Sequence, residues 1–380
     1  MKKDLTHRLG TFSYFTLISH NPMKIGIDSF AAVQGENGQS STPEQRAETV
    51  ENLLTRIELM EHVGLDVFGL GEHHRPEYLD SSPLTILAAA AARTSKIQLL
   101  SAVTVLSAQD PVRVFQQLAT LDIISKGRAG LVAGRGSFSE AFPLFGLSFQ
   151  DYDDLFEEKL ELLLQLRAQE KVTWEGRFRP ALTGQGVYPR PYKPEVPIYV
   201  GVGGTPASFA RAGRLGLPLM IAIIGGQTHR FKPLVDMYYK AGIAAGHPRE
   251  KLKVAVHSLG FIAEYSQSAH EQFFPGYAKT FTQIGQERGW GGAVTRRSYE
   301  SQADEMGALV VGNPEEVADK IIRHSRALGG LTEFRLHMNV AHLTHEQLSS
   351  AIRLLGEEVA PIVREKLGTP GEKVASRMSV

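Results

Sequence analysis

Short apolar runs alternate with amphipathic stretches along most of this chain, and the two patterns predict different elements. A short, uninterrupted apolar run is typical of a strand buried on both faces, whereas apolar positions spaced three and four apart predict a helix. The apolar runs predict eight strands, at 24–28, 65–70, 97–106, 128–133, 196–200, 217–223, 253–263 and 333–338. The amphipathic stretches predict helices at 43–63, from 83, at 111–125, 151–168, 205–215, 228–245 and 268–286, from 314, and at 345–367.

Eight successive strand-then-helix units indicate an α/β fold with a parallel sheet, and this number favours a closed (β/α)8 TIM barrel over an open sheet. No G-x-G-x-x-G follows the first strand, which argues against a dinucleotide-binding sheet. We expect one barrel domain at 23–367, preceded by an N-terminal extension at 1–22 and followed by a flexible tail at 368–380. Two insertions interrupt the pattern, an irregular segment or small hairpin at 169–195 and a glycine-rich, polar segment at 287–312.

Composition excludes several classes of function. The chain has 41 Lys and Arg against 41 Asp and Glu, so it lacks the basic surplus typical of proteins that bind nucleic acid or an anionic membrane. It has no cysteine, which excludes disulfides, thiolate metal sites and cysteine nucleophiles. No run of about 18 apolar residues predicts a membrane span. We therefore expect a cytoplasmic protein that acts on a small molecule, with neither nucleic acid nor membrane as a partner.

Reactive groups in a TIM barrel lie at the C-terminal ends of the strands, and the second predicted strand ends in Glu72-His73-His74. Histidines at this position can act as acid or base near neutral pH, so His73 and His74 are the candidate catalytic residues. The alternative is a polar loop in which one histidine satisfies a backbone carbonyl. Adjacent side chains on an extended backbone point to opposite sides, and we expect no metal site here.

Two further strand ends carry features of an anion site. Gly134-Arg135-Gly136 follows the fourth strand, where glycine permits close backbone approach and a guanidinium pairs with an anion. Gly203, Gly204, Thr205 and Ser208 lie where the fifth strand turns into a helix, whose N-terminal N–H groups favour a phosphate. Each feature alone is also compatible with an ordinary turn, but together they predict a phosphate pocket.

Small residues mark the third strand, where Ser101, Ala102, Val103 and Thr104 follow one another. They suit a flat ligand lying across the barrel mouth, although a packed barrel interior requires small residues equally. His257 lies within the seventh predicted strand, where we expect a role in the core or the wall. His337 at the end of the eighth strand is a weaker candidate for chemistry.

Taken together, these features make the chain resemble the bacterial luciferase-like flavin-dependent oxidoreductases, from Met23 to about Glu365. The resemblance is carried by ordered segments, namely GLDVFGLGEHH at 64–74, DPVR at 110–113, QLATLD at 117–122, SKGR at 125–128, GRG at 134–136, PIYV at 197–200 and LGLP at 215–218.

The resemblance implies a barrel that is commonly dimeric and binds reduced FMN at its C-terminal mouth. Phosphate would be held by Arg135, Gly204, Thr205 and Ser208, and the isoalloxazine would lie against 101–104. Members of this family often carry a non-proline cis peptide there, so Ser101–Ala102 or Ala102–Val103 is the expected position. One histidine of the pair at 73–74 would lie near the flavin and move a proton during the reaction with O2.

The resemblance also guides the choice of cofactor. Relatives that use the deazaflavin F420 usually have Asp-His at the end of the second strand, so Glu72-His73-His74 favours FMN. No extended nicotinamide site is evident, which predicts a separate flavin reductase. The preferred reading is a homodimeric monooxygenase that oxidises an unidentified small organic substrate with O2. The alternatives are an F420-dependent dehydrogenase, a flavin-binding protein without turnover and, least favoured, a hydrolytic barrel. The segment 287–312, with Trp290, Arg296, Arg297 and Tyr299, is a candidate lid or else a loop.

Overall fold

The computed structural model describes residues 22–33, 40–136, 138–289, 291–339 and 343–368. Eight parallel strands form its centre: β1 (Lys24–Ser29), β2 (Val67–Leu70), β3 (Gln98–Val105), β4 (Ala129–Gly134), β7 (Ile198–Val202), β8 (Leu219–Ile223), β9 (Val254–Ile262) and β11 (Glu333–His337). The hydrogen-bonded order is β1, β2, β3, β4, β7, β8, β9, β11, and β11 pairs with β1, so the sheet closes into a barrel. The predicted (β/α)8 TIM barrel is therefore confirmed.

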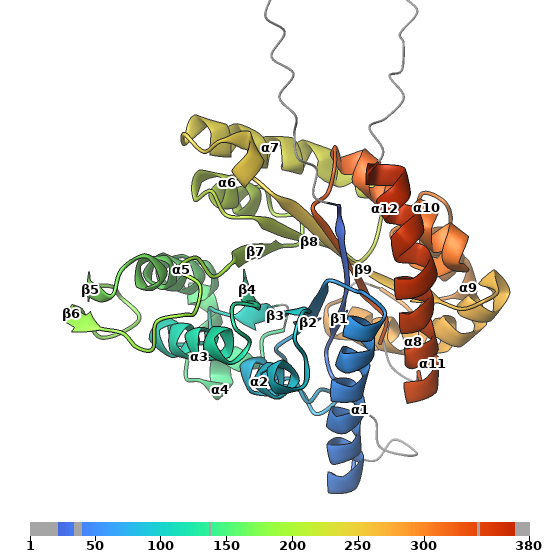
Figure 1. Cartoon of the computed structure of the whole chain (residues 1–380), viewed down its shortest axis with the longest axis horizontal. Coiled ribbons are helices and arrows are strands. Elements are labelled where there is room, and N and C mark those ends of the chain that lie inside the picture. The colour runs from blue at the N-terminus through green and yellow to red at the C-terminus, as the bar shows by residue number, and fades with distance from the viewer. Residues whose placement is uncertain (1–21, 34–39, 137, 290, 340–342, 369–380) are drawn as a thin grey trace, which may run out of the picture.

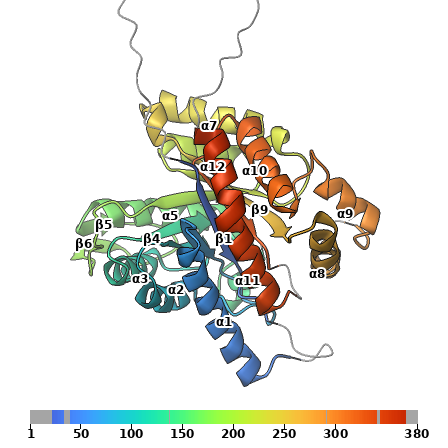
Figure 2. The same cartoon turned by 45° about the vertical axis from the view of Figure 1, so that its right-hand side comes forward.

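Helices cover the outside of the barrel (Figure 1). They are α1 (Pro43–His62), α2 (Pro83–Arg93), α3 (Pro111–Ile124), α4 (Ala141–Leu144), α5 (Tyr152–Ala168), α6 (Pro206–Arg214), α7 (Lys232–Ala244), α8 (Ser266–Glu287), α9 (Arg296–Ala303), α10 (Pro314–Leu328), α11 (His345–Leu354) and α12 (Ala360–Gly368). A π-helical segment, Leu355–Val359, joins α11 to α12, and short 3-10 turns occur at Phe149–Asp151, Thr228–Phe231 and Arg249–Lys251. Figure 2 shows α11 lying beside α1, so the last part of the chain packs against the first.

Side-chain caps fix several helix starts where the sequence places a polar residue before proline. Thr42 and Gln45 form a capping box at α1, and Asn313 and Glu316 form one at α10. The carboxylate of Asp110 accepts hydrogen bonds from the backbone N–H groups of Val112 and Arg113 at α3. These bonds satisfy donors that have no partner within the helix, so they define where each helix begins.

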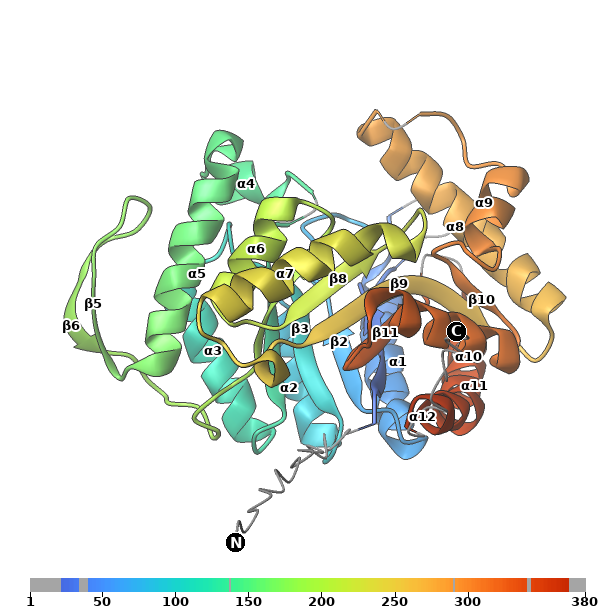
Figure 3. The same cartoon turned by 90° about the horizontal axis from the view of Figure 1, so that it is seen from above.

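Both predicted insertions contain regular structure. The segment 169–195 forms an antiparallel hairpin of β5 (Lys171–Trp174) and β6 (Leu182–Gly186). The segment 287–312 contains α9 and a short strand, β10 (Val310–Gly312), which pairs with the end of β9 and was not predicted. Figure 3 shows the hairpin and the α8–α9 pair projecting at opposite sides of the barrel.

Apolar side chains fill the space between strands and helices, while the barrel interior contains a smaller cluster. That inner cluster consists of Val67, Leu100, Ala102, Val132, Tyr199, Met220 and Ala255. Within the described ranges, no helix is both long and apolar enough to cross a bilayer. The predicted N-terminal extension lies outside these ranges except for Pro22, and the predicted tail does so except for Gly368.

Candidate functional site

A cavity of about 830 Å³ opens at the C-terminal ends of the barrel strands. Each of the eight strands, or the loop that follows it, contributes to its lining, with Asp28, His73, Ala102, Gly134, Gly201, Met220, His257 and His337 as examples. This is the end of the barrel at which TIM-barrel enzymes carry their reactive groups.

A buried carboxylate holds His73 in this cavity. Asp80 accepts a hydrogen bond from Nδ1 of His73 at 2.9 Å and from the backbone N–H of His73 at 3.1 Å. Burial raises the pKa of Asp80, although the hydrogen bond from His73 opposes that shift. With Nδ1 engaged, the Nε2 atom makes no hydrogen bond to any described residue and is available to a ligand.

The neighbouring His74 points elsewhere, as expected for adjacent residues on an extended backbone. Its Nε2 lies 3.2 Å from a carboxylate oxygen of Glu72, and it lines a second, outer pocket rather than the main cavity. Glu72 also accepts hydrogen bonds from the backbone N–H of Val105 at 2.8 Å and from the Gln109 amide at 2.7 Å. The carboxylate therefore ties this loop to the end of β3. Across the described residues, no three His, Asp or Glu side chains are arranged to hold a metal ion.

Several residues of the predicted anion pocket line one corner of the cavity. Arg135, Gly203 and Thr205 line it, and a guanidinium nitrogen of Arg135 lies 3.4 Å from the hydroxyl oxygen of Thr205. Arg135 also forms an ion pair with Asp153 and lies over the ring of Tyr152. Thr205 precedes α6 and its side chain caps no backbone N–H of that helix, so its hydroxyl oxygen is left to accept from Arg135.

Two members of the predicted set lie less directly at this corner. Gly204 adopts a φ of +133°, a conformation that glycine alone adopts readily, and forms the turn into α6. Ser208 is buried in the first turn of α6 and does not line the cavity. Gly134 lines the cavity from the end of β4.

The floor of the cavity is built around Ala102 and Val103, which are joined by a non-proline cis peptide bond. The cis bond occurs at one of the two positions that the resemblance implied. Ser101 and Thr104 do not line the cavity, because their hydroxyl groups are buried and lie 2.6 Å apart, within hydrogen-bonding distance. A Cβ added to Gly134 would lie 2.7 Å from the Val103 side chain, and one added to Gly201 would lie 2.9 Å from it. The lack of side chains at these glycines therefore leaves room for Val103.

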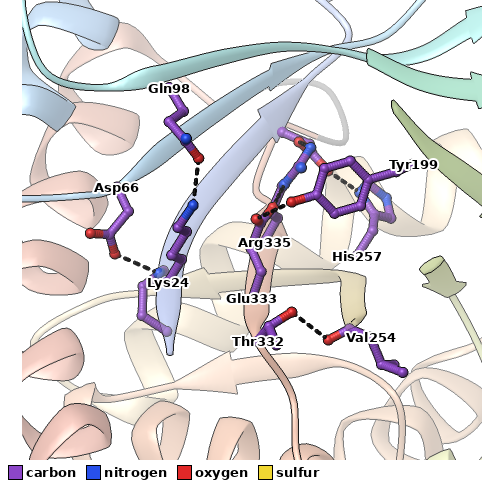
Figure 4. A network of polar contacts seen from close by, with 11 residues as sticks. Lys24, Asp66, Gln98, Tyr199, Val254, His257, Thr332, Glu333 and Arg335 are labelled. Carbon is purple, nitrogen blue, oxygen red and sulfur yellow. Dashed lines mark hydrogen bonds and ion pairs between the residues drawn. The ribbon is translucent and has the colours of Figure 1, made fainter. Parts of the chain in front are cut away.

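A second histidine–aspartate pair lines the same cavity and was not predicted as a unit. Nδ1 of His257 lies 2.7 Å from a carboxylate oxygen of Asp28, and Arg335 contacts the other oxygen at 3.3 Å. Arg335 is fully buried inside the barrel and forms an ion pair with Glu333, which also contacts the Tyr199 hydroxyl (Figure 4). The sequence signal was the carboxylate at the end of the first strand, but its partners lie more than 200 positions away.

The wall next to α8 differs from the predicted lid. The C-terminal part of α8, not α9, lines the cavity through residues such as Lys279, Phe281 and Ile284. Tyr299 on α9 is buried, and its hydroxyl lies 2.8 Å from Nδ1 of His270 on α8, so it anchors α9 behind that helix. Neither Arg296 nor Arg297 lines the cavity, and Trp290 lies outside the described residues.

An arginine joins the end of α8 to the loop after β2. Both guanidinium Nη atoms of Arg75 bond the Glu287 carboxylate at 2.8 Å, and the same side chain reaches Glu77 and Glu140. The guanidinium carbons of Arg75 and Arg288 both lie over the Phe138 ring, 4.8 and 5.0 Å from its centre. These side chains form the boundary between the main cavity and the outer pocket.

Comparison with curated proteins gives relatives over different lengths of the chain. An uncharacterised protein from Sinorhizobium fredii is 30% identical over 179 residues, which is 47% of this chain and 51% of that relative. The chain thus spans about half the length of the first curated relatives that it matches. Limonene 1,2-monooxygenase from Rhodococcus erythropolis is 27% identical over 353 residues, covering 90% of this chain and 89% of that protein.

Three solved structures share the fold over nearly their whole length. Monooxygenase RslO1 from Streptomyces bottropensis superposes with a TM-score of 0.76 at 26% identity, covering 89% of this chain and 99% of that one. The oxygenating constituent of 3,6-diketocamphane monooxygenase from Pseudomonas putida was solved with FMN. It superposes with a TM-score of 0.72 at 21% identity, covering 90% of this chain and 98% of that one. An F420-dependent secondary alcohol dehydrogenase superposes with a TM-score of 0.70 at 21% identity, covering 90% of this chain and 99% of that one. A family model for luciferase-like monooxygenases matches residues 23–332, and the chain belongs to that family.

Proposed function

We propose that this chain is a flavin-dependent monooxygenase that uses reduced FMN and O2 to oxidise a small organic substrate. The observation that carries the proposal is that a single cavity contains His73 oriented by Asp80, the floor of Ala102 and Val103, and the anion corner at Arg135. The likeness to limonene 1,2-monooxygenase, which covers 90% of this chain, supports oxygenation as the reaction. The P. putida neighbour, which is described with FMN, supports the choice of cofactor.

The residues of the cavity fit FMN at both ends. Arg135, Thr205 and the backbone at Gly203 would hold the phosphate, since a guanidinium and free N–H groups complement its charge. Ala102 and Val103 would support the ring system, on a floor that side chains at Gly134 or Gly201 would disturb. When bound, reduced flavin supplies the electrons for oxygen activation, and the protein supplies orientation, electrostatics and exclusion of water.

We assign the proton-transfer role to His73 rather than to His74. Its Nδ1 is fixed by Asp80, so Nε2 can hold or accept a proton at the cavity surface. His74 is engaged with Glu72 outside the main cavity, and we assign it a positioning role in the loop after β2.

The proposal includes a homodimeric assembly, which the family resemblance implies, and a separate flavin reductase, since no extended nicotinamide site is evident in the sequence. A cytoplasmic location is proposed from the composition of the chain. The second candidate function is an F420-dependent dehydrogenase that transfers hydride without O2. Its support is the F420-dependent alcohol dehydrogenase, whose structure is nearly as similar as that of the FMN-bound neighbour.

Anaerobic titration with reduced FMN and, separately, with reduced F420 distinguishes these functions. We expect tighter binding of FMN, and a transient change in flavin absorbance when the loaded protein is mixed with O2. Preference for F420 without an oxygen-dependent transient would identify the dehydrogenase instead. If neither cofactor binds, the flavin proposal is wrong.

A further inference from the structure

The outer pocket, with a volume of about 890 Å³, begins where the anion corner ends. Gly136 and Tyr152, which lie beside Arg135, line both this pocket and the main cavity. The Tyr152 hydroxyl donates a hydrogen bond to the Gly136 carbonyl oxygen at 2.7 Å, and the Arg135 guanidinium carbon lies 5.1 Å from the centre of the Tyr152 ring. A ligand whose phosphate is held at Arg135 can therefore extend past Tyr152 into the outer pocket.

A second guanidinium group faces the same junction. Arg288, which follows α8, lines both cavities. Burial raises the pKa of the Tyr152 hydroxyl, and the positive charges of Arg135 and Arg288 both oppose that rise, so both guanidinium groups act on this one side chain. Two guanidinium groups at one junction complement two linked phosphates, because each can pair with one of them. FMN has one phosphate, whereas FAD has two in succession.

Beyond the junction, the outer pocket presents an aromatic ring with open surface. Phe149 lines this pocket but not the main cavity, and its side chain is 56% exposed. Its ring packs against the rings of Phe142 and Tyr152, with centroids 5.1 Å away in both cases. Neighbouring rings therefore hold Phe149 in place while much of its surface remains available. A purine base stacks favourably on such a surface.

The charges of the outer pocket discriminate between the groups that could follow the phosphate. Three carboxylates, from Glu77, Glu140 and Glu287, line the pocket together with the guanidinium groups of Arg75 and Arg288. Arg75 bonds all three carboxylates, so its charge is already compensated. The surplus of negative charge disfavours a further anionic group, such as the glutamate tail of F420, and is compatible with an uncharged adenosine.

We propose that the outer pocket binds the adenosine half of FAD, with the base on Phe149 and the two phosphates at the junction of Arg135 and Arg288. The inference rests on the proposed function in one respect, that a flavin occupies the main cavity with a phosphate at the anion corner. FAD contains the whole of FMN, so the floor at Ala102 and Val103 serves both. The outer pocket thus makes FAD the flavin that binds more tightly.

Calorimetric titration of the full, flavin-free chain with oxidised FMN and oxidised FAD tests the inference without turnover. The two ligands differ only in the adenosine monophosphate half, so a difference in affinity reports on contacts beyond the first phosphate. We expect FAD to bind roughly fivefold to a hundredfold more tightly than FMN, the range that one stacked base provides.

Variants of the outer pocket locate these contacts. Phe149→Ala removes the stacking surface and should abolish most of the advantage of FAD while leaving FMN affinity unchanged, whereas Phe149→Trp should retain the advantage. Phe145→Ala is the matched control, because Phe145 is 47% exposed on the same segment but lines neither cavity. Arg288→Gln should weaken FAD binding more than FMN binding, since the second phosphate belongs to FAD alone.

FAD binding no more tightly than FMN would overturn the inference, and so would an advantage of FAD that survives in Phe149→Ala. The change in flavin absorbance on mixing with O2 is followed after reduction of the same samples. If FAD keeps its advantage but no such change occurs, the proposed function alone is wrong. If FMN binds and reacts with O2 while FAD has no advantage, the inference alone is wrong. Binding of neither flavin rejects both.

Discussion

Asp80 holds His73 by two hydrogen bonds, one from the imidazole Nδ1 at 2.9 Å and one from the backbone N–H at 3.1 Å. The same carboxylate therefore fixes both the position of the loop after β2 and the orientation of the ring. Because the carboxylate only accepts, it also selects the ring tautomer that leaves Nε2 available to the cavity.

The first prediction follows from this pair. We expect Asp80→Asn to lower kcat by roughly a hundredfold or more, the lower end of what a positioned acid or base contributes, because an amide no longer selects the tautomer. Asp122→Asn is the control, since Asp122 is also buried and accepts backbone hydrogen bonds but lies away from the cavity. Stopped-flow turnover measurements on both variants check this. A normal kcat combined with lower thermal stability would mean that Asp80 is purely structural.

The second prediction concerns the anion corner. We expect Arg135→Gln to weaken FMN binding by roughly tenfold to a hundredfold, which corresponds to the loss of one charge-assisted hydrogen bond. Riboflavin lacks the phosphate, so its affinity should change little in the same variant. Arg179→Gln, which removes an ion-paired arginine outside the cavity, should bind both ligands normally. Equal losses for FMN and riboflavin would place the phosphate elsewhere.

The third prediction is a pH dependence of stability. Burial lowers the pKa of both His324 and His337 to about 3, whereas the unfolded chain has ordinary histidine values near 6.5. Between these values the unfolded state binds more protons, so stability is present above about pH 6.5 and falls as the pH drops towards 3. Each histidine contributes a slope of up to about 1.4 kcal/mol per pH unit.

Chemical unfolding between about pH 4 and 6 measures that slope, and His324→Phe should reduce it by about one histidine's share. The variant is compared with wild type at each pH, so that carboxylates titrating in the same range cancel. An unchanged slope would show that His324 is protonated in the folded protein.

The fourth prediction uses the close packing inside the barrel. A Cβ added to Gly69 would lie 1.9 Å from an Asp28 carboxylate oxygen and 2.9 Å from an Arg335 nitrogen. We expect Gly69→Ala to destabilise the fold by about 1–3 kcal/mol, as overpacking does, and to disturb the contact between Asp28 and His257. Gly203→Ala adds the same methyl group at another strand end, where no atom lies within 4 Å, and should leave unfolding nearly unchanged. Thermal denaturation of the two variants provides the comparison, and equal midpoints would contradict the prediction.

The barrel itself was predictable because its strands are buried on both faces and read as continuous apolar runs. The short β10 was missed because its three residues lie within a polar, glycine-rich segment and take their role only from pairing with β9. The sequence could place His73 and His74 near the mouth, because they follow the C-terminal end of a barrel strand. Their side chains point in different directions because adjacent residues on an extended backbone face opposite sides.

The second histidine pair could not be found in this way. His257 and Asp28 are 229 positions apart, and only closure of the barrel brings them together. The sequence around a residue predicts neither a pairing between distant side chains nor whether a small residue lines a cavity. Ser101 and Ala102 are both small, but the Ser101 hydroxyl is buried beside that of Thr104, whereas Ala102 lines the cavity.

The pairing of β1 with β11 also has a consequence for synthesis on the ribosome. The first strand is translated more than 300 residues before its partner, and Arg335 and His337 arrive only with that partner. Until then the nascent chain has an open sheet whose β1 edge lacks its neighbour, and Asp28 lacks its guanidinium partner. Such an edge is a template for unwanted association, so we expect the interval before β11 is translated to be the one in which the chain is most prone to aggregate.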